Sequence, residues 1–185
     1  MSNVLLGIIG VIFFIGLALA GASYAGSLVL DGTSQANAAQ VTTAAQQTAM
    51  AAKLYRIRTR NYAPNSLTSV DTLIAGRALK SRPANPFVAA NYPIIVGSAG
   101  GLSPTDTSPA NYVLIFLGQS EQARDACIEI ELQSGHTERA DPAVMQQPIS
   151  LLSHANRLKP GCHRSDAGFG GNGGQAGDYV AFYAI

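Results

Sequence analysis

The first 30 residues of the chain form an unbroken apolar stretch. No charged side chain occurs from Met1 to Leu30, and the first one is Asp31. A helix rises about 1.5 Å per residue, so roughly 20 apolar residues cross the hydrocarbon core of a bilayer, which is about 30 Å thick. Such a helix satisfies its own backbone polar groups, so lipid can solvate it. The pattern predicts a helix over residues 1–30 that is long enough to span a membrane.

Three interpretations of this stretch compete. A cleaved secretory signal has a basic region before about 7–15 apolar residues, whereas this run is longer and has no basic residue. The hydropathy fits a helix that crosses the membrane once and anchors the protein there. The third interpretation is a helix that moves between lipid and a protein assembly. The glycines favour it, because Gly in a helix interior costs roughly 1 kcal/mol relative to Ala and makes the helix weaker than a permanent anchor needs to be. We expect the stretch with Gly16, Gly21 and Gly26 to be the flexible part, which loses helical structure in an assembly.

Residues 31–60 stay helical in composition but become polar. They are rich in Ala and Gln, and no Gly or Pro occurs between Thr33 and Tyr62. Mildly apolar side chains recur at spacings of three and four, which predicts the amphipathic half of the same helix, with one stripe packed against a sheet. The stripe consists of Ala38, Val41, Ala45, Thr48, Ala52 and Tyr55.

Basic residues gather where this helix is expected to end. Lys53, Arg56, Arg58 and Arg60 lie near its C-terminus, where positive charge suits the helix dipole. We interpret them as a solvated helix end or as partners in ion pairs between subunits, in preference to contacts with nucleic-acid phosphates.

The remainder, residues 61–185, predicts a globular head. Residues 61–91 read as a long proline-containing connection with a short helix over Ser69–Leu79. Three apolar, β-branched or aromatic runs predict strands. They are Tyr92–Val96, Asn111–Leu117 and Asp178–Ile185.

Three other segments are less regular. Ala126–Leu132 alternates apolar and acidic residues as a strand would, yet Ser120 and the acids after it resemble a helix start, so both readings stay open here. Asp141–Leu158 predicts one or two short helices broken at Pro148, and Gly168–Gly177 predicts a flexible loop.

Composition adds two constraints. Charge is nearly balanced, with 12 basic and 11 acidic residues, and charged residues make up 12% of the chain, against about 25% in ordinary soluble domains. Much of the surface is therefore expected to be buried against other subunits. The cysteines, Cys127 and Cys162, read as one disulfide in an oxidising compartment, with two reduced core cysteines as the alternative.

The order of these features resembles a type IV pilin, most closely the type IVb subclass of toxin-coregulated, bundle-forming and conjugative pili. A charge-free helix runs into an Ala/Gln-rich half, followed by Asn61-Tyr62, by Asn85-Pro86-Phe87 in a proline-rich loop, and by two separated cysteines. The resemblance implies an α+β fold: a long N-terminal helix, its apolar half protruding, packed on a twisted antiparallel sheet with short extra helices. It implies that the cysteine pair ties down the C-terminal region. It also favours a helix from Ser120.

The resemblance implies a structural function. The chain would be a filament subunit serving adhesion, aggregation or conjugative mating contact, with copies of itself, prepilin peptidase and the inner-membrane assembly machinery as partners, and with a cell-surface receptor as a further one. It would be N-methylated, would reside in the inner membrane with a periplasmic head, and would then enter an extracellular pilus. The alternatives are a minor pilin or pseudopilin of a secretion system, or a lone membrane-anchored periplasmic binding domain.

The chain departs from the family at its start. Such pilins usually carry glutamate at the fifth mature position, which pairs with a neighbour's terminal amine, whereas this chain has Leu5. We take Met1 as the first mature residue, with the leader absent from the numbering. Apolar packing should then drive assembly, and the amine of Met1 should find another polar partner.

No catalytic, cofactor or metal site is predicted. Gly168–Gly173 matches GxGxxG spacing, but that fingerprint has meaning only between a strand and a helix. His136, His154 and His163 lack metal-ligand spacing, and no serine sits in a nucleophile elbow. We therefore expect no enzyme activity and no specific nucleic-acid partner.

Overall fold

A computed structural model of the chain describes most of the head and the long helix. The described residues are 2–63, 68–87, 94–97, 112–149, 160–166 and 174–185. Within residues 2–31 the backbone is described, and a side chain only at Ile15. Some predicted positions lie outside the described residues: Met1, Tyr92, Pro93, Asn111, 150–158 and 168–173.

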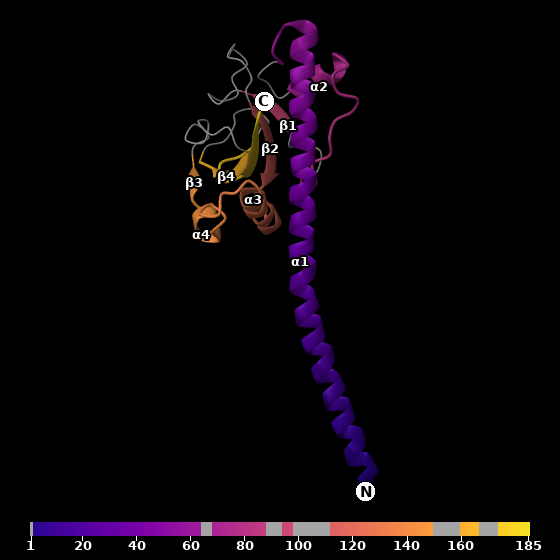
Figure 1. Cartoon of the computed structure of the whole chain (residues 1–185). Helices are drawn as coiled ribbons and strands as arrows, with labels where there is room; N and C mark the ends of the chain where they lie inside the picture. Colours follow the sequence, from indigo (N-terminus) through magenta and orange to yellow (C-terminus); the bar gives the residue numbers. More distant parts are fainter. Residues whose placement is uncertain (1, 64–67, 88–93, 98–111, 150–159, 167–173) are drawn as a thin grey trace.

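The described elements give an α+β fold with one N-terminal helix, four antiparallel strands and one disulfide (Figure 1). In chain order they are α1 (Ser2–Thr59), α2 (Ser69–Ala75), β1 (Ile94–Gly97), β2 (Tyr112–Gly118), α3 (Glu121–Gln133), α4 (Pro142–Met145), β3 (Pro148–Ile149), β4 (Gly161–Ser165) and β5 (Tyr179–Ala184).

Helix α1 is continuous over 58 residues, and Gly32 does not interrupt it. Its second half lies against the head and packs on α3, β2 and β5, whereas its first half extends beyond the head (Figure 1). The predicted stripe faces the head, because Ala38, Val41, Ala45 and Thr48 are fully buried, Ala52 is 5% exposed and Tyr55 is half-buried. Alanines dominate the stripe, so the helix axis can approach the sheet closely.

The sheet has the strand order β1-β2-β5-β4-β3. The pairs β1–β2, β2–β5 and β5–β4 are antiparallel, and the two-residue β3 pairs in parallel with β4. The three predicted strands are present as β1, β2 and β5. Strands β1 and β2 end one residue later than predicted, and β5 ends one residue earlier. The last of them, β5, lies in the centre of the sheet.

Both faces of the sheet are buried, with side chains alternating between them. Val113, Ile115, Ala181 and Tyr183 face the cluster that includes α1 and α3. A second cluster occupies the opposite face, with Ile95, Leu114, Phe116, Val180 and Phe182. The phenol of Tyr183 joins sheet and helix directly, because it lies 2.8 Å from Thr42 Oγ1 on α1.

The segment that holds the first cysteine is helical. The Ser120 side chain accepts a hydrogen bond from the Ala123 amide at 3.1 Å, which caps α3. The strand reading of Ala126–Leu132 is therefore wrong. Burial follows the helical period, with Ala126, Cys127, Ile130 and Glu131 inside and Leu132 44% exposed.

The region after α3 differs in part from the prediction. Asp141 caps the short α4, accepting from the Ala143 amide at 2.8 Å, and Pro142 occupies the first turn as expected. Pro148 then begins the strand β3 instead of a second helix. Strand β4, Gly161–Ser165, was not predicted, because its sequence GCHRS has no run of β-branched residues.

Candidate assembly surfaces

The outward face of α1 is poor in charge for a helix exposed to solvent. No charged residue occurs from Gly32 to Ala52. Two large apolar side chains spaced seven residues apart project from this face, Met50 with 70% and Ile57 with 76% exposure. Residues seven apart lie on the same side of a helix, so they form a narrow apolar ridge that the head leaves uncovered and that the exposed Lys53 interrupts.

The predicted assembly residues of the N-terminal half lie away from the head (Figure 1). The backbone is helical through Gly16, Gly21 and Gly26, and Leu5 lies in the second turn of α1. These positions therefore share one continuous helix. Ile15, whose side chain is described, is 51% exposed.

Membrane insertion was the first expectation for residues 1–30. Among the residues and side chains that the structure describes, no helix combines the length and the hydropathy needed to cross a bilayer. The side chains of residues 2–14 and 16–31 lie outside that description, so the predicted span stays a prediction.

The two cysteines meet inside the head. Cys127 on α3 and Cys162 on β4 form a disulfide with their Cα atoms 5.3 Å apart, and both residues are buried. The bridge joins a helix to a strand that is distant in sequence. It therefore closes the region from α3 to β4 into one covalent loop.

A buried carboxylate reinforces the same junction. Glu131 is 0% exposed, and its Oε1 accepts a hydrogen bond from the Cys162 amide. Gly161 precedes that amide, and a Cβ there would lie 2.6 Å from the Phe182 ring and 2.7 Å from Glu131 Oε1. Glycine is therefore required for β4 to approach α3 this closely. The sequence reading missed Glu131, because hydropathy places an acid on the surface.

The Asn85-Pro86-Phe87 motif ties the connecting segment to the sheet. The Asn85 amide nitrogen Nδ2 donates to the carbonyl of Phe116 on β2 at 2.7 Å. The same side chain accepts from the Phe87 amide at 3.1 Å. Asn85 therefore fixes a local turn and anchors it on the sheet, which gives a physical reason for an asparagine in this motif.

Two arginines, one after α1 and one after α2, have unusual backbone conformations. Arg60 follows α1 with a φ of 57° and Arg77 follows α2 with a φ of 54°, in the left-handed region that glycine adopts most easily. The Arg58 guanidinium donates to the Arg77 carbonyl at 2.9 Å, and the Arg56 guanidinium stacks 4.3 Å from the centre of the Tyr62 ring. These contacts order the cationic end of the helix.

The described histidines and acids of the head do not form a reactive cluster. Within the described part of the chain, no three His, Cys, Asp or Glu residues are placed to share a metal ion. His163 lies buried on β4 with its ring 5.6 Å from that of Phe182, which suits a core residue. His154 and the glycine pattern of residues 168–173 lie outside the described residues.

Comparisons of the chain with protein-family models, with curated proteins and with solved structures found no match.

Proposed function

We propose that the chain is the structural subunit of a type IVb-like pilus filament with a pilin-type head. Its apolar N-terminal helix would form the filament core, and the heads would form the outer surface that serves adhesion, aggregation or conjugative mating contact. This role needs no catalytic residue and no cofactor.

The observation that carries the proposal is the projection of α1 from the head. A helix of 58 residues is about 87 Å long, and its buried residues among the described side chains lie between Ala38 and Ala52. The half from residue 2 to residue 30 carries no charge and extends beyond the head (Figure 1). An apolar helix of this kind has to be covered by lipid or by other proteins, and a bundle of its own copies provides such a cover.

The outward face of the other half supports the same conclusion. The ridge of Met50 and Ile57 and the charge-free stretch from Gly32 to Ala52 suit contact with neighbouring helices. A solitary anchor would leave this face in water, where apolar ridges are unfavourable.

The proposal also specifies a life cycle. The subunit would wait in the inner membrane with its head in the periplasm, be processed by prepilin peptidase, be methylated at Met1 and be extracted by the assembly machinery. The Cys127–Cys162 bridge suits a head that lies in an oxidising compartment.

Leu5 separates the proposed mechanism from the usual one. A carboxylate within lipid is costly and is retained only for function, so with Leu5 apolar packing would drive assembly and the amine of Met1 would find a polar partner other than a glutamate. The variant Leu5→Glu should therefore assemble no better than the wild type, with Leu5→Gln as the uncharged control of similar size. A clear gain with glutamate alone would show that a docking site for the acid exists, and would favour an accessory subunit that works beside glutamate-bearing pilins.

The direct experiment is to shear filaments from cells that express the full chain and to examine them by electron microscopy and mass spectrometry. The proposal expects filaments in which this chain is the main component. A few copies per filament would make it a minor pilin, copies confined to a secretion complex would make it a pseudopilin, and absence from every filament would refute the proposal.

A further inference from the structure

Charge is segregated along the chain although the net charge is close to zero. Seven of the twelve Lys and Arg residues, but one of the eleven Asp and Glu residues, lie between Lys53 and Arg82, so this segment has a formal charge of +6 and the rest of the chain −5. Arg82 pairs with the acidic residue, Asp71, at 2.6 Å. The other six cations are all exposed. We call them the basic end: Lys53, Arg56, Arg58, Arg60, Arg77 and Lys80.

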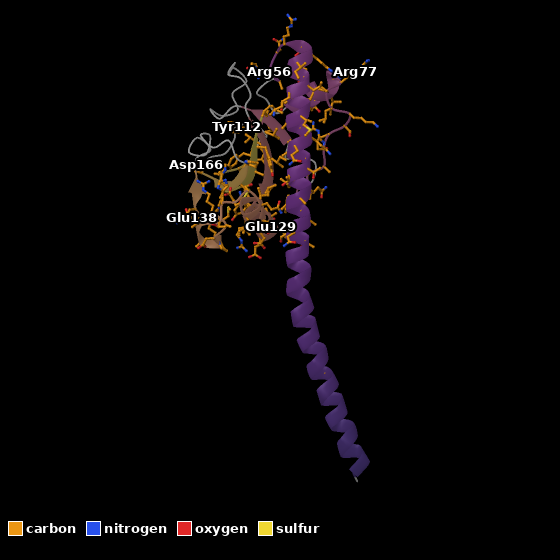
Figure 2. The ribbon with its side chains drawn as sticks, in the orientation of Figure 1. Arg56, Arg77, Tyr112, Glu129, Glu138 and Asp166 are labelled. Carbon is orange, nitrogen blue, oxygen red and sulfur yellow. A yellow bond between two sulfur atoms is a disulfide. The ribbon has the colours of Figure 1, made fainter. Side chains whose placement is uncertain are left out.

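Acids outnumber bases on α3, on the turn after it and at the start of α4. Glu121, Glu138 and Asp141 are exposed, Glu129 is half-buried, and the half-buried Arg139 lies between Glu138 and Asp141. We call these four acids the acidic end. Arg124, which lies among them, is engaged by Asp125 at 3.0 Å. Figure 2 shows Arg56 and Arg77 at the end of the head farthest from the N-terminus, and Glu129 and Glu138 at the end nearest to it.

The backbone of the basic end indicates that its arginines serve more than the fold. Arg60 and Arg77 both occupy the left-handed conformation in which glycine would relieve strain. Strained conformations of this kind gather at sites where a side chain is needed for function. The stacking of Arg56 on Tyr62 and the bond from Arg58 to the Arg77 carbonyl hold the cations on one surface before any partner arrives.

We propose that the basic end of one head docks on the acidic end of a second copy that is displaced along the direction of α1. The inference rests on the proposed filament and names the contact between its heads. The two surfaces lie at opposite ends of the head along α1, so a contact between them is head-to-tail. Repeated head-to-tail contacts that do not close into a ring generate an open helical filament. Opposite charges would fix the register, while the apolar helices supply most of the affinity.

Charge reversal in the full chain tests this contact. The variant Arg56→Glu/Arg77→Glu presents acids at both ends, and Glu129→Lys/Glu138→Lys presents bases at both ends. Each variant expressed alone should yield at most about one tenth of the sheared filament that the wild type yields, because like charges would face each other across the contact. Co-expression of the two variants should restore filaments in which they alternate. The control Arg56→Lys/Arg77→Lys keeps the charges and should assemble normally.

A second measurement does not depend on pili. Detergent-solubilised wild-type chain should associate in analytical ultracentrifugation at about 0.01 M salt, where the screening length is about 30 Å, and dissociate at about 1 M, where it is about 3 Å. Mixing the two reversed variants should restore association at low salt.

The outcomes separate the two proposals. Absence of wild-type filaments refutes the pilus, and the ultracentrifuge then still decides the docking contact. Wild-type filaments together with normal assembly of both reversed variants would overturn the docking contact and leave the pilus standing. Failure of the mixed variants to recover would also overturn it. If Arg56→Glu/Arg77→Glu assembles normally but loses binding to a labelled DNA duplex, the basic end serves a nucleic acid instead.

Discussion

Removal of the disulfide should destabilise the head by a large fraction of its total stability. The perturbation is Cys127→Ala together with Cys162→Ala, because alanine leaves no hydroxyl in a site where both residues are buried. The bridge has a sequence separation of 35, and the chain-entropy relation gives about 4 kcal/mol for a loop of this length. A whole domain has a net stability of about 5–15 kcal/mol, so few other pairs of residues contribute as much.

The measurement is urea unfolding of the full chain in detergent, followed by far-ultraviolet circular dichroism. Three samples separate the causes: oxidised wild type, reduced wild type, and the double alanine variant. Reduced wild type lacks only the covalent link, so it should lose about 4 kcal/mol, and the alanine variant should lose somewhat more because it also loses packed sulfur atoms.

The loss of stability should also reduce the amount of subunit and prevent filament formation. Insertion of the N-terminal helix should persist in the variant, because α1 does not include either cysteine. The amount of subunit should fall and sheared filaments should disappear. A loss below about 1 kcal/mol, the size of an ordinary point mutation, would refute the reasoning, as would filaments from the variant or free thiols in native subunit.

Three further changes have defined outcomes. Arg60→Gly should raise the free energy of unfolding by about 1 kcal/mol because glycine relieves the left-handed strain, and Arg60→Ala should not. Tyr183→Phe should cost about 1 kcal/mol in urea unfolding, because it loses its hydrogen bond to α1. Burial raises the pKa of Tyr183 above its ordinary value of 10.0, so this tyrosine ionises at a lower pH in the unfolded chain than in the folded one. The free energy of unfolding of the wild type should therefore fall as the pH rises past 10.0, and that of Tyr183→Phe should fall less. Alanine at Gly16, Gly21 and Gly26 together should favour the helix by about 1 kcal/mol per site and stiffen filaments in electron micrographs; unchanged yield and flexibility would contradict this.

The long helix and the central strands could be predicted from local patterns, because their burial follows hydropathy. The stripe from Ala38 to Ala52 repeats at three and four residues, and β2 and β5 are dense in β-branched and aromatic residues. In both cases most of the residues that the head buries are apolar, with Thr48 as an exception on α1.

Local patterns are ambiguous where tertiary contacts reverse hydropathy. The sequence of Ala126–Leu132 alternates as a strand would, so periodicity leaves both readings open, and the resemblance favours the helix that the structure has. In α3 the charged Glu131 is buried while the apolar Leu132 is 44% exposed, which hydropathy does not predict. Glu131 is inside because the amide of Cys162, 31 residues later, donates to it. Strand β4 has no local signal, since it is held by pairing with β5 and by the disulfide. The basic end could have been found by counting charges along the chain, but the position of the opposing acids required the fold.

The central place of β5 affects when the head can fold during biosynthesis. Strand β5 pairs with β2 on one side and with β4 on the other, yet it comes after both of them in the chain. Until residues 179–184 emerge, β2 has an unpaired edge and the core beneath it is open to water, a state that is prone to aggregation. Translocation would therefore deliver an unfinished head across the membrane. Any chain that stops short of Tyr179 would keep its apolar helix and lack the central strand of the sheet, which would mark it for removal by proteases.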